Sequence, residues 1–207
     1  MNFLAHAYLS GDDKFVMIGN FIADAVKGNS YTKFPEHMQL GILLHRFIDS
    51  YTDNHPLFRS SKRRLQAKYD KFSGVIVDIY YDHFLARDWN EYSAIDLEDF
   101  VSEAYSTLIN HFFLLPARSK RILPFMVSQN WLVGYANFKD LDRVFKGMSN
   151  RVRKYNSGME RAVDDLKRDH QLFHEEFSAF FPELSNYVKA KKVELGIETE
   201  SHKKKGD

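Results

Sequence analysis

Apolar residues recur along most of the chain at the three- and four-residue spacing of amphipathic helices. In residues 14–27 they stand at positions 15, 18, 22 and 26, and Gly28 follows as a C-cap. Pro35 and Glu36 suit a first helical turn, so a helix is expected over residues 35–52, before Pro56. Later helices are expected over residues 96–115, 118–130, 138–150 and 158–180, with Pro182 interrupting the chain before a final charged helix.

Residues 73–88 carry a mixed signal. The run VIVDIYY concentrates β-branched residues, which suits a strand. Asp78 and Asp82 share one stripe of a helix, however, and this period favours the helical interpretation. No segment alternates strictly between apolar and polar residues, and no internal repeat occurs. The sequence therefore predicts an all-α protein, a compact bundle of seven to nine helices with one domain over residues 1–190 and a charged, frayed tail over residues 191–207.

Ionisable side chains interrupt four apolar runs in the first part of the chain. They are His6 in NFLAHAYL, Asp24 in GNFIADAV, His45 and Asp49 in LLHRFIDS, and Asp82 with His83 in IYYDHFLA. Buried imidazoles and carboxylates cost free energy unless they are paired or bound to a metal. Side chains four residues apart lie on the same face of a helix, so His45 and Asp49 can contact one object.

Nitrogen and oxygen donors without a thiolate suit Mn²⁺, Mg²⁺, Fe²⁺ or Zn²⁺. Such an ion activates water and polarises a phosphoryl oxygen. Each residue also has a structural interpretation. His6 suits a hydrogen-bonded core histidine, Asp24 a group at a helix end, and His45 with Asp49 an intrahelical pair. Asp53, shortly before Pro56, suits turn chemistry. The coincidence of several such groups favours a metal site, whereas His111, His170 and His174 stand in surface-like contexts and are assigned no role.

Composition narrows the possible functions. Hydrophobic residues make up 44% of the 207 residues and aromatic residues 15%, which is enough for a folded core. The net charge is +1, so any charged partner must bind a local patch rather than the whole chain. The absence of cysteine excludes disulfides and thiolate sites, and it fits a cytoplasmic location. No segment approaches about 18 uncharged apolar residues, so no membrane span is expected.

Five segments together resemble the acyl carrier protein phosphodiesterases, also called acyl carrier protein hydrolases. In order, they are MNFLAHAYLS at 1–10, GNFIADAVKG at 19–28, HRFIDSYTDNHP at 45–56, DIYYDHFLARDW at 78–89 and QNWLVGYANF at 129–138. That family looks like a divergent branch of the HD-domain metal-dependent phosphohydrolases, so the resemblance implies an HD-domain-like helical bundle. This chain departs from the HD pattern because the adjacent pair reads Asp82-His83.

The resemblance implies hydrolysis of the phosphodiester that joins phosphopantetheine to a serine of holo acyl carrier protein. It also implies a divalent cation, with Mn²⁺ favoured and Mg²⁺ or Fe²⁺ possible. The positions expected to hold the metal are Asp24, His45, Asp82 and His83, with His6 as a further ligand. Asp49 is expected to orient the water or accept its proton, and Arg46 to clamp the phosphate.

Acyl carrier protein, the implied partner, is acidic along the helix after its modified serine. Residues 57–70 form a basic segment in which Arg59, Lys62 and Arg63 are candidates for docking that protein. A second basic group comprises Arg151, Arg153 and Lys154. The alternative for these residues is a solvated face. Nucleic acid is not expected, because the aromatic residues fall at core spacing.

Two other functions fit the same residues. One is an HD-type phosphohydrolase acting on a nucleotide, with Tyr80, Tyr81 or Trp131 stacking on the base. The other is a non-catalytic helical module that binds a carrier protein, in which the polar cluster is a buried hydrogen-bond network.

Overall fold

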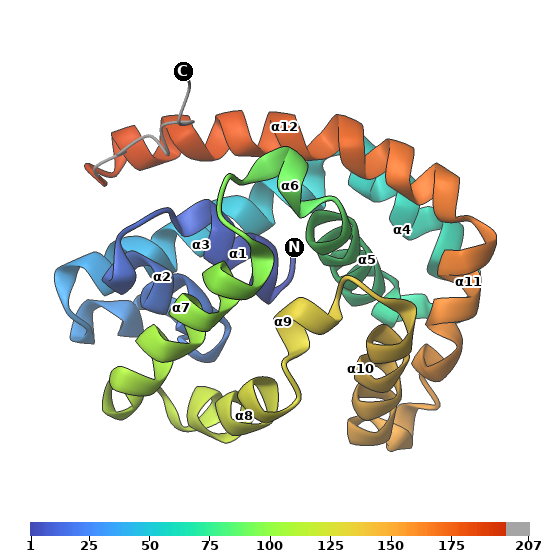
Figure 1. Ribbon diagram of the computed structural model, residues 1–207, viewed down its shortest axis with the longest axis horizontal. Helices are drawn as coiled ribbons and strands as arrows, with labels where there is room; N and C mark the ends of the chain where they lie inside the picture. Colours follow the sequence, from blue (N-terminus) through green and yellow to red (C-terminus); the bar gives the residue numbers. More distant parts are fainter. Residues whose placement is uncertain (198–207) are drawn as a thin grey trace.

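The computed structural model describes residues 1–197, and these fold into α-helices joined by short turns, several of them 3-10 helices (Figure 1). The α-helices are α1 (Phe3–Ser10), α2 (Lys14–Ile22), α3 (Glu36–Asn54), α4 (Pro56–Tyr69), α5 (Ser73–Arg87), α6 (Trp89–Tyr92), α7 (Leu97–Asn110), α8 (Ala117–Ser128), α9 (Trp131–Gly134), α10 (Phe138–Arg151), α11 (Ala162–Arg168) and α12 (His170–Glu194). The all-α prediction is confirmed. The described part holds twelve α-helices rather than seven to nine, because several segments expected to be loops contain one or two helical turns.

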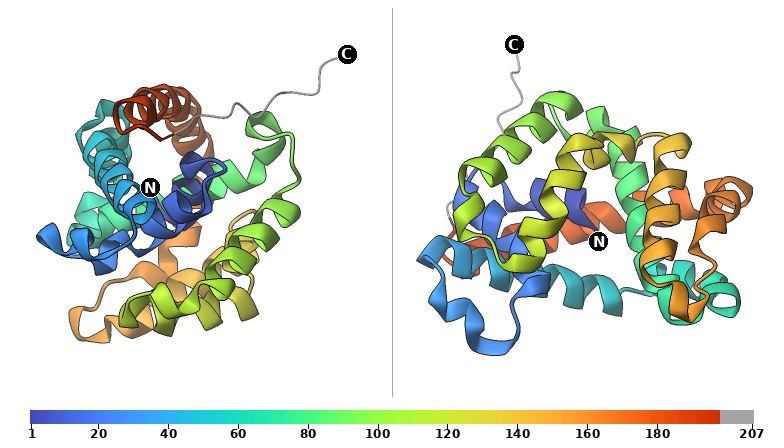
Figure 2. Two further views of the ribbon diagram at one scale, coloured as in Figure 1. Left: turned by 90° about the vertical axis from the view of Figure 1, so that its left-hand side faces the viewer. Right: turned by 90° about the horizontal axis from the view of Figure 1, so that it is seen from below.

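Helices α1, α3 and α5 form the centre of the bundle. Helix α2 lies along α3, α1 contacts α2, α3 and α5, and α12 crosses α3, α4 and α5. Figure 1 shows α12 running over one side of the molecule, while α8, α9 and α10 lie on the opposite side. The two views in Figure 2 show the N-terminus between these two layers, in the middle of the bundle.

Helix α5 explains the mixed signal of residues 73–88. Its side chains from Tyr80 to Leu85 are all buried, and Tyr80 and Tyr81 pack edge-on against Phe173 and Phe177 of α12. A helix buried on nearly every side has no polar face, so the 3.6-residue period is weak in its sequence.

Three predicted boundaries were wrong. The expected helix over residues 158–180 divides into α11 and α12. Pro182 does not interrupt the last helix but lies inside α12. Proline removes only one backbone hydrogen bond, and α12 is held against the bundle by the buried Phe180 and Phe181 before Pro182 and by the buried Leu184 and Val188 after it. Residues 191–194 of the expected frayed tail belong to α12, and residues 198–207 lie outside the described residues.

Within residues 1–197, no helix has both the length and the apolar character that crossing a membrane requires.

Candidate metal and catalytic site

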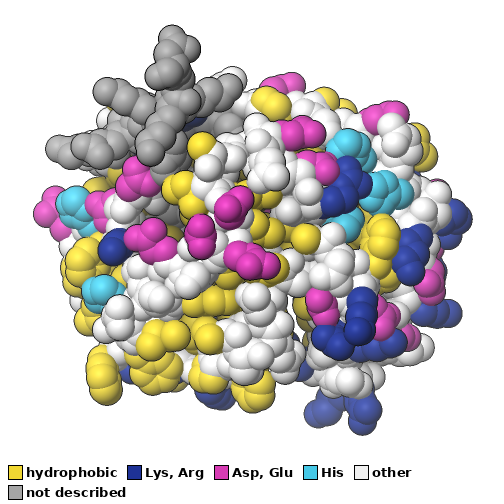
Figure 3. All heavy atoms as spheres, viewed as in Figure 1, with side chains coloured by type: hydrophobic (Ala, Val, Ile, Leu, Met, Phe, Trp, Pro, Cys, Tyr) yellow, Lys and Arg dark blue, Asp and Glu magenta, His cyan; other side chains and the backbone are white. Residues whose placement is uncertain are grey.

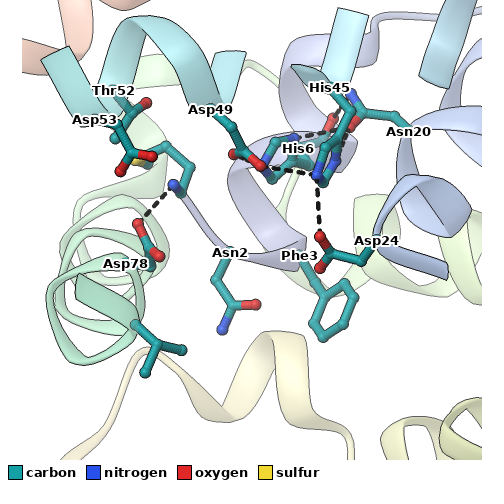
Figure 4. A pocket seen from close by; sticks show the side chains of 12 residues that line it. Asn2, Phe3, His6, Asn20, Asp24, His45, Asp49, Thr52, Asp53 and Asp78 are labelled. Atoms are coloured by element: carbon teal, nitrogen blue, oxygen red, sulfur yellow. Dashed lines mark hydrogen bonds and ion pairs between the residues drawn. The ribbon is translucent and has the colours of Figure 1, made fainter. Parts of the chain in front are cut away.

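A pocket of about 180 Å³ opens where α1, α3 and the turn after α2 meet (Figure 4). Figure 4 shows His6, Asn20, Asp24, His45 and Asp49 gathered on one side of it, and Asp53 and Asp78 on the other, with Asn2 between them. The structure thus brings together four of the residues singled out in the sequence, although they come from three different elements.

Asn20 fixes the orientation of both imidazoles. Its Oδ1 lies 2.7 Å from Nδ1 of His6 and 3.0 Å from Nδ1 of His45, while its Nδ2 donates to the carbonyl of His6 and to Ser10 Oγ. The amide oxygen can only accept, so each Nδ1 carries the proton and donates it. The two rings stack with centroids 4.1 Å apart, and both Nε2 atoms point towards the pocket.

Carboxylate oxygens face both Nε2 atoms. Asp49 Oδ1 lies 3.1 Å from His6 Nε2, and Asp49 Oδ2 lies 3.0 Å from His45 Nε2. Asp24 Oδ1 lies 3.5 Å from the same His45 atom. His45 Nε2 is buried, yet it makes no hydrogen bond of normal geometry with any residue in the described range.

A nitrogen lone pair and a carboxylate oxygen repel each other unless a proton or a cation lies between them. Both Nε2 atoms are in this position. His6, His45 and Asp49 each offer one ligand atom, and these three atoms lie within 4.8 Å of one another. The donor set is nitrogen and oxygen only, with the other imidazole nitrogen held by an amide, which is the usual arrangement of a metal-binding histidine. The site is therefore compatible with a divalent metal ion.

The protonation of the cluster reflects the same crowding. Burial lowers the pKa of His6 to about 4, helped by the neighbouring His45. Burial also acts to lower the pKa of His45, but the carboxylates of Asp24 and Asp49 outweigh it and raise that pKa to about 9. The two histidines hold the pKa of Asp49 well below its usual range although burial opposes them. In this arrangement one proton occupies a position that a cation would take.

The far side of the pocket is also acidic. Asp78 Oδ1 lies 2.7 Å from the α-ammonium group of Met1, and burial raises the pKa of that carboxyl. Asp53 is exposed at the same side. Four carboxylates thus line the pocket. Their negative charge attracts cations, and it repels anions unless a cation is bound with them.

The structure does not bring Asp82 and His83 to the pocket, contrary to the ligand set expected from the sequence. The carboxylate of Asp82 accepts from the backbone N–H groups of Asn2, Leu4 and Ala5, so it caps the N-terminus of α1. His83 Nδ1 donates to the carbonyl of Tyr135, and its ring packs against Phe138. Adjacent residues on a helix point about 100° apart, which separates the two side chains.

Arg46 is also placed differently from the expectation. Its guanidinium donates to the carbonyls of Val26 and Gly28 and lies 5.2 Å from the ring centroid of Tyr31. It therefore holds the turn that carries Asp24 rather than projecting into the pocket.

The docking candidates lie on α4. Arg59 donates to the carbonyl of Asp53 and to Asn54 Oδ1, so it joins the ends of α3 and α4. Lys62 is partly buried and Arg63 is exposed.

The prediction from sequence missed Asn20. A signal was present, because GNFIADAV carries an amide as well as a carboxylate inside an apolar segment. An amide buried in a helix needs hydrogen-bond partners as much as a charged group does.

The fold and the site together define a class: an all-helical protein with a cluster of imidazole and carboxylate donors that is compatible with a divalent cation. Within that class, the chain belongs to the acyl carrier protein phosphodiesterase family, whose model matches residues 1–184.

Curated relatives agree with this. The chain is 30% identical over 194 residues to the acyl carrier protein phosphodiesterase of Yersinia enterocolitica, covering 93% of this chain and 100% of the relative. The corresponding protein of Yersinia pestis is 31% identical over the same extents. That of Photorhabdus laumondii is 31% identical over 183 residues, covering 88% of this chain and 92% of the relative. No solved structure matches the chain.

Proposed function

We propose that this protein hydrolyses the phosphodiester between 4′-phosphopantetheine and the serine of holo acyl carrier protein, using a divalent cation. Water adds to phosphorus, the bond from phosphorus to the serine oxygen breaks, and the serine oxygen takes the proton that the water gives up. The products are apo acyl carrier protein and 4′-phosphopantetheine. Membership of the family supports the substrate, and the arrangement of His6, His45 and Asp49 supports the chemistry.

The observation that carries the proposal is the pair of Nε2 atoms that face one carboxylate, at 3.1 Å and 3.0 Å from Asp49. We assign His6, His45 and Asp49 as the ligands, which moves Asp49 from the water-orienting role expected from sequence. A bound cation would lower the pKa of a water ligand and neutralise charge on the phosphoryl oxygens. Mn²⁺ is our first choice, with Mg²⁺ or Fe²⁺ as alternatives, because no sulfur ligand is present in the cluster.

Asp24 is the group placed to orient the attacking water. It stands at the rim of the pocket, with its side chain 64% exposed and one oxygen 3.5 Å from His45 Nε2. A carboxylate in that position accepts a hydrogen bond from water without leaving the site.

The nucleotide alternative loses the three aromatic residues that were expected to stack on a base. Tyr80 and Tyr81 have no exposed surface, so neither can stack on a base. Trp131 lines a different groove.

The test is intact-mass spectrometry of holo acyl carrier protein after incubation with the metal-stripped protein, with and without Mn²⁺. We expect the carrier protein to lose the mass of its prosthetic group only when metal is added. His45→Ala and Asp49→Asn should abolish the loss, and His174→Ala, a histidine outside the pocket, should not.

A panel of nucleotides assayed in parallel examines the competing activity. Retention of the prosthetic group with every metal tested, or full turnover by Asp49→Asn, would contradict the proposal. Metal content measured on the purified protein separates a catalyst from a helical module that binds no ion.

A further inference from the structure

A second groove, of about 440 Å³, lies between α8, α9 and α10. We call it the α8–α10 groove. It is lined by four exposed arginines, Arg118, Arg121, Arg143 and Arg151, and by aromatic side chains, Phe125 and Trp131. Figure 3 shows part of the surrounding surface, where Lys and Arg side chains gather over α10 and α11 and acidic side chains lie across the middle of the face.

Most of the positive charge in this groove is unpaired. Arg143 forms an ion pair with Asp140 at 2.6 Å, whereas Arg118, Arg121 and Arg151 form none with any residue between positions 1 and 197. Arg151 lies over the ring of Trp131, 5.4 Å from its centroid. Phe125 is 58% exposed, so its ring is accessible to a partner.

Helix α4 carries the docking surface expected from sequence, but several of its basic side chains bind groups of this chain. Arg64 makes two hydrogen bonds to Glu176, and Lys68 lies 2.6 Å from Asp165. Arg59 is held by the end of α3. On α4, only basic side chains that lack a partner within this chain are available to attract an acidic protein.

The α8–α10 groove also adjoins the pocket. Arg118 Nη1 donates to the carbonyl of Asp24, at 3.4 Å, so the groove begins where the pocket's rim ends. Asn2, which lines the pocket, donates from Nδ2 to the hydroxyl of Tyr135, the residue directly after α9, at 3.2 Å. A protein bound in the groove would therefore also lie next to the mouth of the pocket.

We propose that the α8–α10 groove is the surface on which the acidic helix of the carrier protein docks. The inference rests on the proposed function for the identity of the partner. A groove lined by aromatic side chains and arginines has the composition of a protein interface, because Trp and Arg are enriched among the residues that dominate binding free energy. Arginine forks bind carboxylates in pairs, so an acidic helix is the complementary partner.

The experiment measures binding separately from turnover. Fluorescently labelled apo acyl carrier protein, which lacks the bond to be cleaved, is titrated with the full-length protein, and anisotropy reports the dissociation constant. Arg121→Glu combined with Arg151→Glu should weaken binding by about tenfold or more. The matched control is Lys62→Glu combined with Arg63→Glu on α4, which makes the same change in net charge and should weaken binding less than about threefold.

Two controls are measured on each variant. Hydrolysis of a small phosphodiester tests whether the pocket is intact, and the melting temperature tests whether the fold is intact. Unchanged carrier binding after the Arg121 and Arg151 reversals would overturn the proposal, as would an equal loss in the α4 control. A dissociation constant for RNA or anionic vesicles tighter than that for the carrier would also overturn it. Binding that depends on these arginines without removal of the prosthetic group would leave docking intact and reject the hydrolytic function instead.

Discussion

Asn20 determines which nitrogen of each histidine faces the pocket. Its single oxygen accepts from both Nδ1 atoms, and its nitrogen is tied to the carbonyl of His6 and to Ser10. Without that oxygen, each ring could rotate or change tautomer, and the lone pairs on Nε2 would no longer be directed at one point.

We therefore expect Asn20→Ala to weaken Mn²⁺ binding by about 10- to 100-fold, as loss of such outer contacts usually does. Isothermal titration calorimetry on metal-stripped protein measures the effect. Ser10→Ala is the control, because it removes the acceptor of a hydrogen bond from the amide nitrogen and leaves the accepting amide oxygen in place. Equal affinities for wild type and Asn20→Ala would show that the amide has only a packing role.

Asp82 gives a pH dependence to stability. Burial raises its pKa to about 7, against the opposing effect of the N-terminal ammonium and the backbone donors of α1. A carboxyl whose pKa is higher in the folded state binds more protons there than in the unfolded state. The stability that it contributes is therefore present at acid pH and is lost as pH rises through about 7.

In the Asp82→Asn variant the side chain cannot ionise, so the variant should not lose stability in this way as pH rises. Between about pH 5 and about pH 8, the free energy of unfolding of the variant should improve relative to wild type by roughly 2–3 kcal/mol. Urea denaturation at both pH values provides the comparison. A constant difference across that range would mean that the carboxyl does not titrate there.

At the scale of helices, the contact between α2 and α3 sets the geometry of the site. A Cβ on Gly19 would lie 2.1 Å from the carbonyl oxygen of Met38, and one on Gly41 would lie 2.1 Å from that of Val16. No side chain fits between these backbones, so the two helices lie closer together than helices usually do. Asn20 follows Gly19, and His45 stands one turn after Gly41, which places their side chains within hydrogen-bond distance.

Gly41→Ala should force α2 and α3 apart. We expect the free energy of unfolding to fall by roughly 1–3 kcal/mol or more, because the overlap is with backbone rather than with a flexible side chain. Metal affinity should fall with it. Gly147→Ala in α10, where a Cβ meets nothing within 4 Å, should instead leave stability unchanged or raise it by up to about 1 kcal/mol. Equal effects of the two substitutions in urea melts would contradict this account.

For the whole molecule, the site joins elements that are distant in sequence. Its groups come from α1, the end of α2 with the turn that follows it, and α3, so the folded chain alone brings them together. An ion that binds only the folded state stabilises it by mass action.

Mn²⁺ at about one hundred times its dissociation constant should add about 2.7 kcal/mol to the free energy of unfolding. For a chain of this length, the melting temperature should then rise by roughly 5–10 °C. Differential scanning fluorimetry with and without chelator measures the shift. His45→Ala should show none, and a shift of the same size in that variant would place the ion elsewhere.

The fold class and part of the site were predictable from sequence. The helical period marks α3 and α10 clearly, and His6, Asp24, His45 and Asp49 stand out as ionisable groups in apolar segments. Pro182 was misleading because a proline in the sequence does not reveal how strongly the flanking turns are packed. Asp82 and His83 were misleading for a related reason, since a buried polar group in sequence does not name its partner.

The sequence by itself determined that the chain is helical, that it resembles one family, and that some imidazoles and carboxylates must be buried, because period and composition are properties of the chain. Tertiary structure alone decided which of them meet. Asn20 and Asp49 converge on two histidines while Asp82 caps α1, because side-chain partners depend on how helices cross. For α2 and α3, that crossing is set by close packing at Gly19 and Gly41.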